Sequence, residues 1–270
     1  MIFYRVSFGY CCKNDLENAT TTVDNYLAAL AKNGQIDKNY TIVPWQKQVI
    51  AYINTIGLEA DQLKSHSANG KERLKDVEKF FKSSPVWICN EDFPPTQKAI
   101  WKNASFLYLY VPYYQQGTPL HRGDNNDAVP LYRVPITDKD REDVYFWQQY
   151  YQECDNIWQE NSKLTIDAYR MLADPASELS KQGRELCLAI EKATGIPTYY
   201  YLMRFFGRKH EEEIQRKCPC CGNSWAVKQP QQQISEPERF CHFYFQCQPC
   251  RLVSHLASGN VNLRYAKIGE

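Results

Sequence analysis

The residues with the clearest chemistry are two pairs of cysteines near the C-terminal end of the chain. Cys218 and Cys221 are separated by two residues and followed by Gly222, and Cys247 and Cys250 repeat the spacing. A Cys-x-x-Cys turn directs two thiolates at one ion, and four thiolates at about 2.3 Å complete a tetrahedral zinc site. Such a site has no open position for water. We therefore expect Cys218, Cys221, Cys247 and Cys250 to bind a structural Zn2+ ion.

The segment between the two pairs predicts the hairpin of a zinc ribbon. Residues 229–238 are rich in Gln and Pro and predict a protruding loop, which leaves short strands at 224–227 and 240–246. The other thiols and imidazoles nearby are Cys220, Cys241, His242 and His255. We expect these four to pack or to face solvent, with replacement of a predicted ligand by Cys220, Cys241 or His242 as the alternative.

The composition is that of a soluble globular protein in a reducing compartment. The chain has 270 residues, a net charge of +1 and an odd total of 11 cysteines. Its first ten residues lack the basic start and apolar run of a signal peptide, and no apolar run reaches the length of a membrane span. We expect a cytoplasmic protein without membrane association, whose paired cysteines bind metal and do not form disulfides.

Alternating strand and helix patterns predict an α+β fold: an α/β sandwich body with a helical extension and a C-terminal zinc ribbon. We divide the chain into an α/β domain at 1–112 and an irregular loop at 113–136. A helical extension that ends in an aromatic strand follows at 137–207, and the four-cysteine ribbon occupies 208–270. The loop assignment rests on several Gly, Pro, Asp and Asn residues without periodicity.

The first half of the chain predicts four strands and two helices. Strands are expected at 2–8, 47–54, 85–89 and 105–111, where apolar residues alternate or β-branched and aromatic residues gather. Apolar residues from Leu16 to Leu30 recur at helical spacing, and Asn33-Gly34 supplies a stop. A second helix is expected at 71–82.

The second half predicts three helices and one aromatic strand. Thr137 and Asp140 can cap a helix that continues to Trp158, a second helix is expected at 162–172, and a third begins at Asp174-Pro175 and ends at Gly195. The strand at 198–206 contains three consecutive tyrosines. We expect these tyrosines to fill a core, with base stacking as the alternative.

The basic end of the chain suggests a polyanion partner. Residues 196–270 contain ten Lys or Arg and six Asp or Glu residues. We predict a non-catalytic, nucleic-acid-binding role in which cations neutralise phosphates and an aromatic ring, Trp225 or Phe240, stacks on a base. The predicted nucleic-acid contacts are Arg204, Arg208, Lys209, Arg216, Lys217, Trp225, Arg239 and Arg251.

Two other functions fit parts of the same pattern. The ribbon can dock an acidic protein surface, which makes the protein an interaction scaffold, and the acidic run at 211–213 opposes a polyanion. An enzyme would place its acid and base at His121, Asp124 and Asp127, with Arg122 as an anion contact. Because no phosphate loop, nucleophile elbow or metalloprotease helix occurs, and Asp and Asn commonly form turns, we expect no catalysis.

Three stretches carry a family resemblance: residues 183–191 (GRELCLAIE), 194–202 (TGIPTYYYL) and 216–222 (RKCPCCG). They resemble an uncharacterised bacterial family described as Zn-ribbon-containing, possibly nucleic-acid-binding proteins. The likeness continues through residues 119–135 and 245–254. The resemblance implies a bacterial cytoplasmic protein whose ribbon cysteines are the four named above. Relatives in that family have cysteines near the Gly-Asp of the loop, where this chain has Arg122 and Asn125, so we expect no metal or redox chemistry there.

Overall fold

The chain divides into two units in a computed structural model that describes residues 2–11, 15–57, 59–89, 101–112, 117–160, 163–227, 243–259 and 261–270. Unit 1 comprises residues 1–100, 115–118 and 128–145, and unit 2 comprises residues 101–114, 119–127 and 146–270. These boundaries follow spatial contact, whereas the four segments predicted from the sequence follow chain order. That division stays a prediction.

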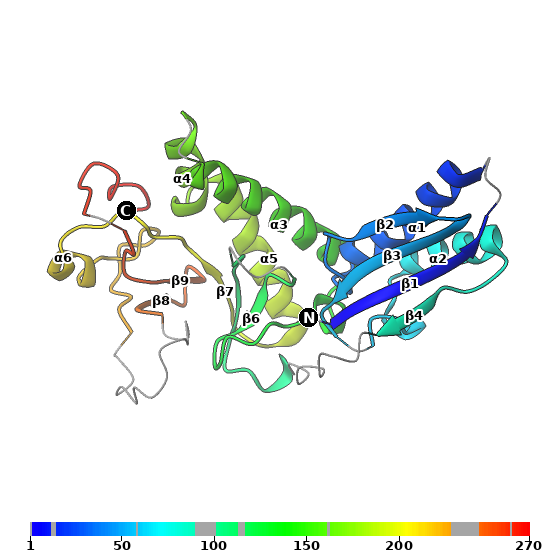
Figure 1. Ribbon diagram of the computed structural model, residues 1–270. Helices are drawn as coiled ribbons and strands as arrows, with labels where there is room; N and C mark the ends of the chain where they lie inside the picture. The colour runs from blue at the N-terminus through cyan, green and yellow to red at the C-terminus, as the bar shows by residue number, and fades with distance from the viewer. Residues whose placement is uncertain are drawn as a thin grey trace. The chain divides into compact units, whose positions relative to one another are not determined.

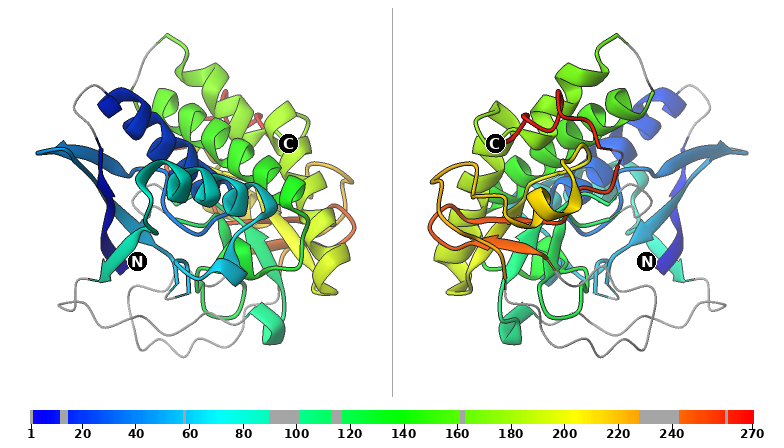
Figure 2. Two further views of the ribbon diagram at one scale, coloured as in Figure 1. Left: turned by 90° about the vertical axis from the view of Figure 1, so that its right-hand side faces the viewer. Right: turned by 90° about the vertical axis from the view of Figure 1, so that its left-hand side faces the viewer.

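Unit 1 is built on a four-stranded antiparallel sheet. Its elements follow the order β1 (Ile2–Tyr10), α1 (Leu16–Lys32), β2 (Thr41–Trp45), β3 (Gln48–Thr55), α2 (Ala68–Phe81) and β4 (Val86–Cys89). The sheet order is β2-β3-β1-β4, so the two central strands are β3 and β1. Both helices lie on the same face of the sheet (Figure 1, Figure 2).

The core of unit 1 follows from the alternation along its strands. Ile2, Tyr4, Val6 and Phe8 of β1 are buried against residues of α1 and α2, whereas the side chains between them point the other way. The Ser67 hydroxyl caps α2 by accepting a hydrogen bond from the backbone N–H of Gly70. The strands and helices predicted for this unit are present. The sequence did not predict β2, an edge strand that tolerates Pro44.

Unit 2 contains a mixed five-stranded sheet. Its strands are β5 (Leu107–Leu109), β6 (Leu120–Arg122), β7 (Thr198–Tyr201), β8 (Phe245–Cys247) and β9 (Leu252–Ser254), in the order β6-β5-β7-β9-β8. Strand β7 runs parallel to both β5 and β9. The expectation of an irregular loop at 113–136 is corrected at β6 and at a 3-10 turn, Leu131–Arg133.

Three helices precede β7 in the chain: α3 (Asp138–Gln159), α4 (Thr165–Ala173) and α5 (Glu178–Thr194). The part of α3 up to residue 145 belongs to unit 1, and the rest of α3, α4 and α5 belong to unit 2. Thr137 and Asp140 form the predicted capping box, since each backbone N–H donates to the other side chain. The predicted start of α5 at Asp174 is wrong, because Ser177 is the residue whose hydroxyl accepts from Ser180 N–H. Gly195 ends α5 at φ +71°, as predicted.

The remaining elements are short. They are two further 3-10 turns, Leu63–Ser65 and Trp101–Asn103, and the helix α6 (His210–Ile214). The predicted aromatic strand ends at Tyr201, earlier than its apolar run suggests, and its tyrosines Tyr199 and Tyr200 are buried in the core as expected. The fold is α+β. Within the described parts of the chain, no helix combines the length and apolar character required to cross a bilayer.

Candidate metal centre

The four predicted cysteines converge at one point of unit 2. The Sγ atoms of Cys218, Cys221, Cys247 and Cys250 all lie within 4.8 Å of one another, and those of Cys221 and Cys247 are 3.7 Å apart. Four sulfurs bound tetrahedrally at zinc distances are about 3.8 Å apart. The cluster therefore has the donor set and spacing of a closed four-thiolate site. The four clustered cysteines form no disulfide.

The first pair is held by a turn that requires a glycine. The backbone N–H of Gly222 donates to the Cys218 carbonyl at 2.8 Å, and Cys218 N–H donates to the Asn223 carbonyl at 2.9 Å. Gly222 has φ +70°, a left-handed conformation that L residues with a side chain rarely adopt. This turn places Cys218 in the interior and leaves Cys221 exposed.

The second pair is held by a hairpin that belongs to the sheet of unit 2. Cys247 ends β8 and lies opposite Leu252 of β9, and Cys250 lies in the turn between them. Strand β9 in turn pairs with β7, where Tyr200 lies opposite Leu252. Of the strand pair predicted at 224–227 and 240–246, the described residues show an isolated antiparallel bridge between Ala226 and Phe245, whereas residues 240–242 lie outside the described part of the chain. The site is thus joined to the sheet of unit 2 through its second pair.

The cysteines of the cluster differ in how readily they ionise in the metal-free protein. The hydrogen bond from the Asn223 backbone lowers the pKa of Cys221 to about 7, whereas burial raises the pKa of Cys247 to about 11 and also raises that of Cys250. Metal binding requires thiolates, so these protons must leave when an ion binds.

The other nearby thiols and imidazoles do not join the cluster in the described structure. Cys220 is exposed, and its Sγ accepts a hydrogen bond from Nη1 of Arg184 at 3.4 Å. His255 contacts the rings of Tyr201 and Phe243. Cys241 and His242 lie outside the described residues, as do Phe240 and Arg239.

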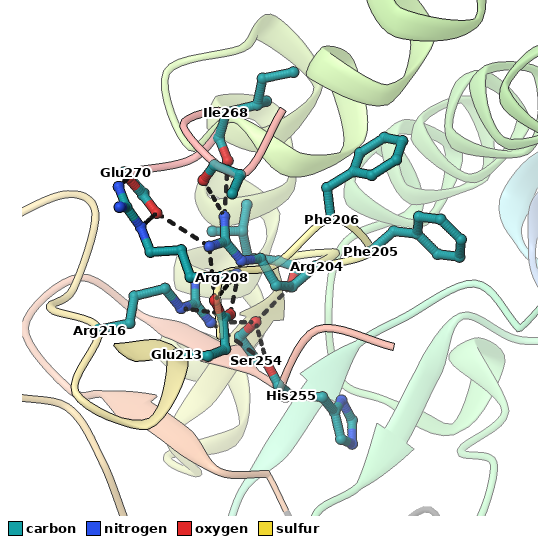
Figure 3. Close-up of polar contacts among 12 residues, drawn as sticks. Arg204, Phe205, Phe206, Arg208, Glu213, Arg216, Ser254, His255, Ile268 and Glu270 are labelled. Carbon is teal, nitrogen blue, oxygen red and sulfur yellow. Dashed lines mark hydrogen bonds and ion pairs between the residues drawn. The ribbon is translucent and has the colours of Figure 1, made fainter. Parts of the chain in front are cut away.

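A buried ion network lies beside the first cysteine pair. Arg204 has a side chain that is 1% exposed and donates Nε to Oε1 of Glu213 at 2.9 Å. Its Nη1 donates to the carbonyls of Ala266 and Ile268 at 2.7 and 3.1 Å. Figure 3 shows Arg204 and Arg208 converging on Glu213 and Glu270. Burial alone would raise the pKa of Glu213, but hydrogen bonds from Arg204 hold it below its usual value.

Burial removes three residues from the predicted nucleic-acid contacts. Arg204 is enclosed in the network above, and Arg216 lies over the rings of Trp225 and Phe245, at 4.7 and 4.5 Å from their centroids. Trp225 is 2% exposed, stacks on Phe245, and donates Nε1–H to the Arg216 carbonyl at 3.0 Å. These side chains pack the unit internally, and the 5% of the Arg216 side chain that is exposed lines a cavity.

The other described cations of that prediction are at least partly accessible. Lys209 and Lys217 are exposed, Arg208 is 36% exposed and paired with Glu270, and Arg251 is paired with Glu191. A cavity of about 370 Å³ opens next to the first cysteine pair. It is lined by Arg208, Glu212, Arg216, Lys217, Cys218, Pro219, Gly222 and Glu270.

The alternative acid-base residues of the loop have internal partners. His121 is 1% exposed, stacks near Tyr108 and Tyr110, and burial lowers its pKa to about 4. Asp124 accepts hydrogen bonds from Ser105 and Arg122. The side chains of His121 and Asp124 therefore take part in packing within the unit. The sequence did not predict the aromatic environment of His121.

Fold and site together define an α+β protein with a four-cysteine site joined to a mixed sheet. Residues 101–203 match the family described as Domain of unknown function (DUF2310), and residues 207–259 match Domain of unknown function (DUF8594). Two proteins of Haemophilus influenzae, each described as "Uncharacterized protein", are 37% and 36% identical over 171 residues, 63% of this chain. The alignments cover 80% of the first relative and 62% of the second.

The chain belongs to the same bacterial family as these two uncharacterised proteins. The family match to residues 207–259 contains all four clustered cysteines. No solved structure matches the chain.

Proposed function

We propose that the four-cysteine cluster binds one zinc ion with a structural role, in a non-catalytic protein that binds nucleic acid. The observation that supports zinc is the approach of four sulfurs to within 4.8 Å of one another, with no fifth donor group in the cluster among the described residues. Four protein thiolates saturate a tetrahedral ion and leave no position for a substrate. Bound there, zinc would cross-link the two cysteine pairs.

The nucleic-acid part of the proposal rests on the cations beside the first pair. Lys217 directly precedes Cys218, Lys209 lies at the start of α6, and Arg208 lines the cavity together with Lys217. Exposed cations around a concave surface attract phosphates, and binding then releases counterions. Because Arg204, Arg216 and Trp225 are buried, we assign the phosphate contacts to Arg208, Lys209 and Lys217.

An acidic protein surface is the alternative partner for the same cations. Glu212 and Glu270 line the cavity alongside Arg208 and Lys217, which lowers its positive charge. A partner protein with charges of both signs could pair with the cations and with the carboxylates of the cavity. A polyanion would be repelled by the two carboxylates. The experiment below separates the two partners.

The test is fluorescence anisotropy of the zinc-loaded full chain with a labelled single-stranded RNA, for wild type and a double variant, Lys209→Ala with Lys217→Ala. We expect weaker binding and a salt slope that is shallower by about 0.7 per lost phosphate contact. The matched control is Lys181→Ala with Lys192→Ala, which removes the same charge from exposed positions on α5. Equal loss in both variants would assign the effect to net charge and refute the proposed surface.

A further inference from the structure

Among the described residues of unit 1, helices cover one face of the sheet and leave the other face open. The chain order β1-α1-β2-β3-α2-β4 with sheet order β2-β3-β1-β4 is the split β-α-β arrangement, and both helices lie on a single face (Figure 1). Four-stranded sheets of RNA-recognition modules stack bases on aromatic side chains of such an open face. A shared arrangement alone does not assign function, so the residues of the open face must decide.

Two aromatic side chains occupy the centre of the open face. Phe3 lies on β1 and Tyr52 on β3, the two central strands, and they are 37% and 39% exposed. Their ring centroids are 5.8 Å apart and their planes differ by 8°. The two rings do not point into the core of unit 1, because the core lies on the opposite side of both strands. They present two parallel, accessible rings to solvent.

The charge of this face is positive. Arg5 lies opposite Tyr52 on one side and opposite Ile88 of β4 on the other, so its side chain emerges beside the aromatic pair. Arg5 is also the single Asp, Glu, Lys or Arg residue within the four strands of the sheet. The strands have a cation beside two parallel rings and no carboxylate. The cation complements the phosphate backbone of a nucleic acid, and the rings complement the faces of its bases.

Polar side chains next to the rings supply hydrogen-bonding groups. Asn54 lies opposite Phe3 in the β1–β3 register, and Ser7 lies two residues beyond Arg5 on the same face. The amide and the hydroxyl can each donate and accept hydrogen bonds. Unpaired bases expose edges that donate and accept hydrogen bonds to such groups. The bases of a duplex are stacked and paired and cannot reach the rings.

We propose that the open face of the unit 1 sheet binds unpaired bases of a single-stranded nucleic acid. Phe3 and Tyr52 stack on bases, and Arg5 contacts the backbone phosphate. The proposal rests on the proposed function in sharing its class of ligand, but it uses a separate surface with residues of its own. Failure of the lysine surface described above would therefore leave this face to be judged by its own variants.

The test measures anisotropy of the zinc-loaded full chain with labelled single-stranded RNA, single-stranded DNA and duplex RNA. The variants are Phe3→Ala, Tyr52→Ala and the two together. Removing a stacking side chain weakens binding by about 5- to 150-fold per base, and we expect losses in this range for both single strands. Tyr52→Phe keeps the ring and should bind as wild type does. Arg5→Gln should reduce the salt slope by about 0.7.

The matched control is Tyr150→Ala, which removes a tyrosine of α3 that is 40% exposed, close to the 39% of Tyr52. It should bind as wild type does. Photocrosslinking of the wild-type protein provides a readout that does not depend on the folding of any variant, and crosslinked peptides should contain Phe3 or Tyr52. If the Phe3 and Tyr52 variants lose affinity only for single-stranded RNA, the ligand is RNA. If they lose affinity for both single-stranded RNA and single-stranded DNA, the face binds either single strand.

Three outcomes would overturn the proposal. Wild type could bind no oligonucleotide at low salt, the Phe3→Ala and Tyr52→Ala double variant could bind as tightly as wild type, or crosslinks could fall only in the residues around the four cysteines. Concentration-dependent self-association that the double variant abolishes, without any nucleic-acid binding, would instead assign the face to a second copy of the chain.

Discussion

Tyr200 and Leu252 lie opposite each other in the parallel pairing of β7 and β9, and Leu252 is two residues beyond Cys250 of the four-cysteine cluster. Strand β9 therefore belongs both to the hairpin that carries the second cysteine pair and to the sheet of unit 2. The sequence suggested a separate four-cysteine ribbon at 208–270. The pairing instead couples the integrity of the cluster to the interior of the sheet.

Removing the metal should expose the edge of β7. The backbone N–H groups of Tyr200 and Leu202 donate to the carbonyls of Arg251 and Val253 at 2.8 and 2.9 Å. Because the β8–β9 hairpin would lose its cross-link, we expect a chelator to accelerate hydrogen exchange at both amides. Hydrogen exchange resolved by NMR would measure this.

The amides of β1 and β3 in unit 1 serve as the internal control, since their ladder has no partner in the cysteine hairpin. They should exchange equally fast with and without chelator. Unchanged exchange at Tyr200 and Leu202 after complete metal removal would show that β9 stays folded without the ion.

Cys218→Ser should lower the zinc content, whereas Cys220→Ser should leave it unchanged. Cys218 contributes a buried Sγ to the cluster, whereas Cys220 is exposed and lies outside it. Elemental analysis of the purified proteins should find zinc in wild type and Cys220→Ser, and a loss of zinc in Cys218→Ser. Zinc loss in Cys220→Ser with retention in Cys218→Ser would reverse the ligand assignment.

Arg204→Met should destabilise unit 2 strongly. Its side chain is 1% exposed and donates two hydrogen bonds to Glu213, which is 3% exposed, so the substitution removes the hydrogen-bonded charge partner of a buried carboxylate and leaves it the longer pair with Arg216 at 3.4 Å. Such a loss costs about 3–5 kcal/mol in the free energy of unfolding. Urea denaturation would measure the change.

Arg170→Met provides the comparison. Its pair with Asp167 is 59% and 71% exposed, and removing an exposed pair of this kind costs about 0–1 kcal/mol. If the two variants unfolded at the same urea concentration, the buried network around Glu213 would not stabilise the fold as described.

Acid pH should destabilise unit 2 through His121. Burial lowers the pKa of this imidazole to about 4, and an unfolded histidine has a pKa of about 6.5. Between these values the unfolded chain binds the extra proton, so the stability contributed by His121 is complete above about pH 6.5 and lost as pH falls toward 4. The loss amounts to about 3 kcal/mol at most.

The measurement compares the pH dependence of urea unfolding for wild type and His121→Phe, which keeps a ring beside Tyr108 and removes the titrating group. The variant should show a flatter dependence between pH 4 and 6.5 than wild type. Both proteins lose thiolate ligands in acid, so the difference between them isolates the imidazole. Identical pH profiles would contradict the assignment.

The sequence predicted the cysteine cluster because its signal is local. Cys218 and Cys221, like Cys247 and Cys250, have fixed spacing, and the glycine that forms the first turn follows directly. Alternation along β1 and the capping residues Thr137 and Asp140 are local signals of the same kind. They identify strands and helices without information about distant partners.

The sequence could not predict which cations are accessible. Arg204 and Lys209 are both basic residues near the cysteines, but Arg204 is enclosed by carbonyls of residues 266 and 268 and by Glu213. These partners are up to 64 residues away, and no periodic pattern reports such contacts. Strand β6 escaped prediction for a similar reason, because its three residues become a strand only by pairing with β5.

Anisotropy of the zinc-loaded wild type against labelled single-stranded RNA at several salt concentrations tests most directly whether the chain binds nucleic acid. We predict binding whose log K falls linearly with log salt, with a slope of about 0.7 per phosphate contacted. Absence of binding to single-stranded RNA, single-stranded DNA and duplex even at low salt would contradict the claim and favour a protein partner.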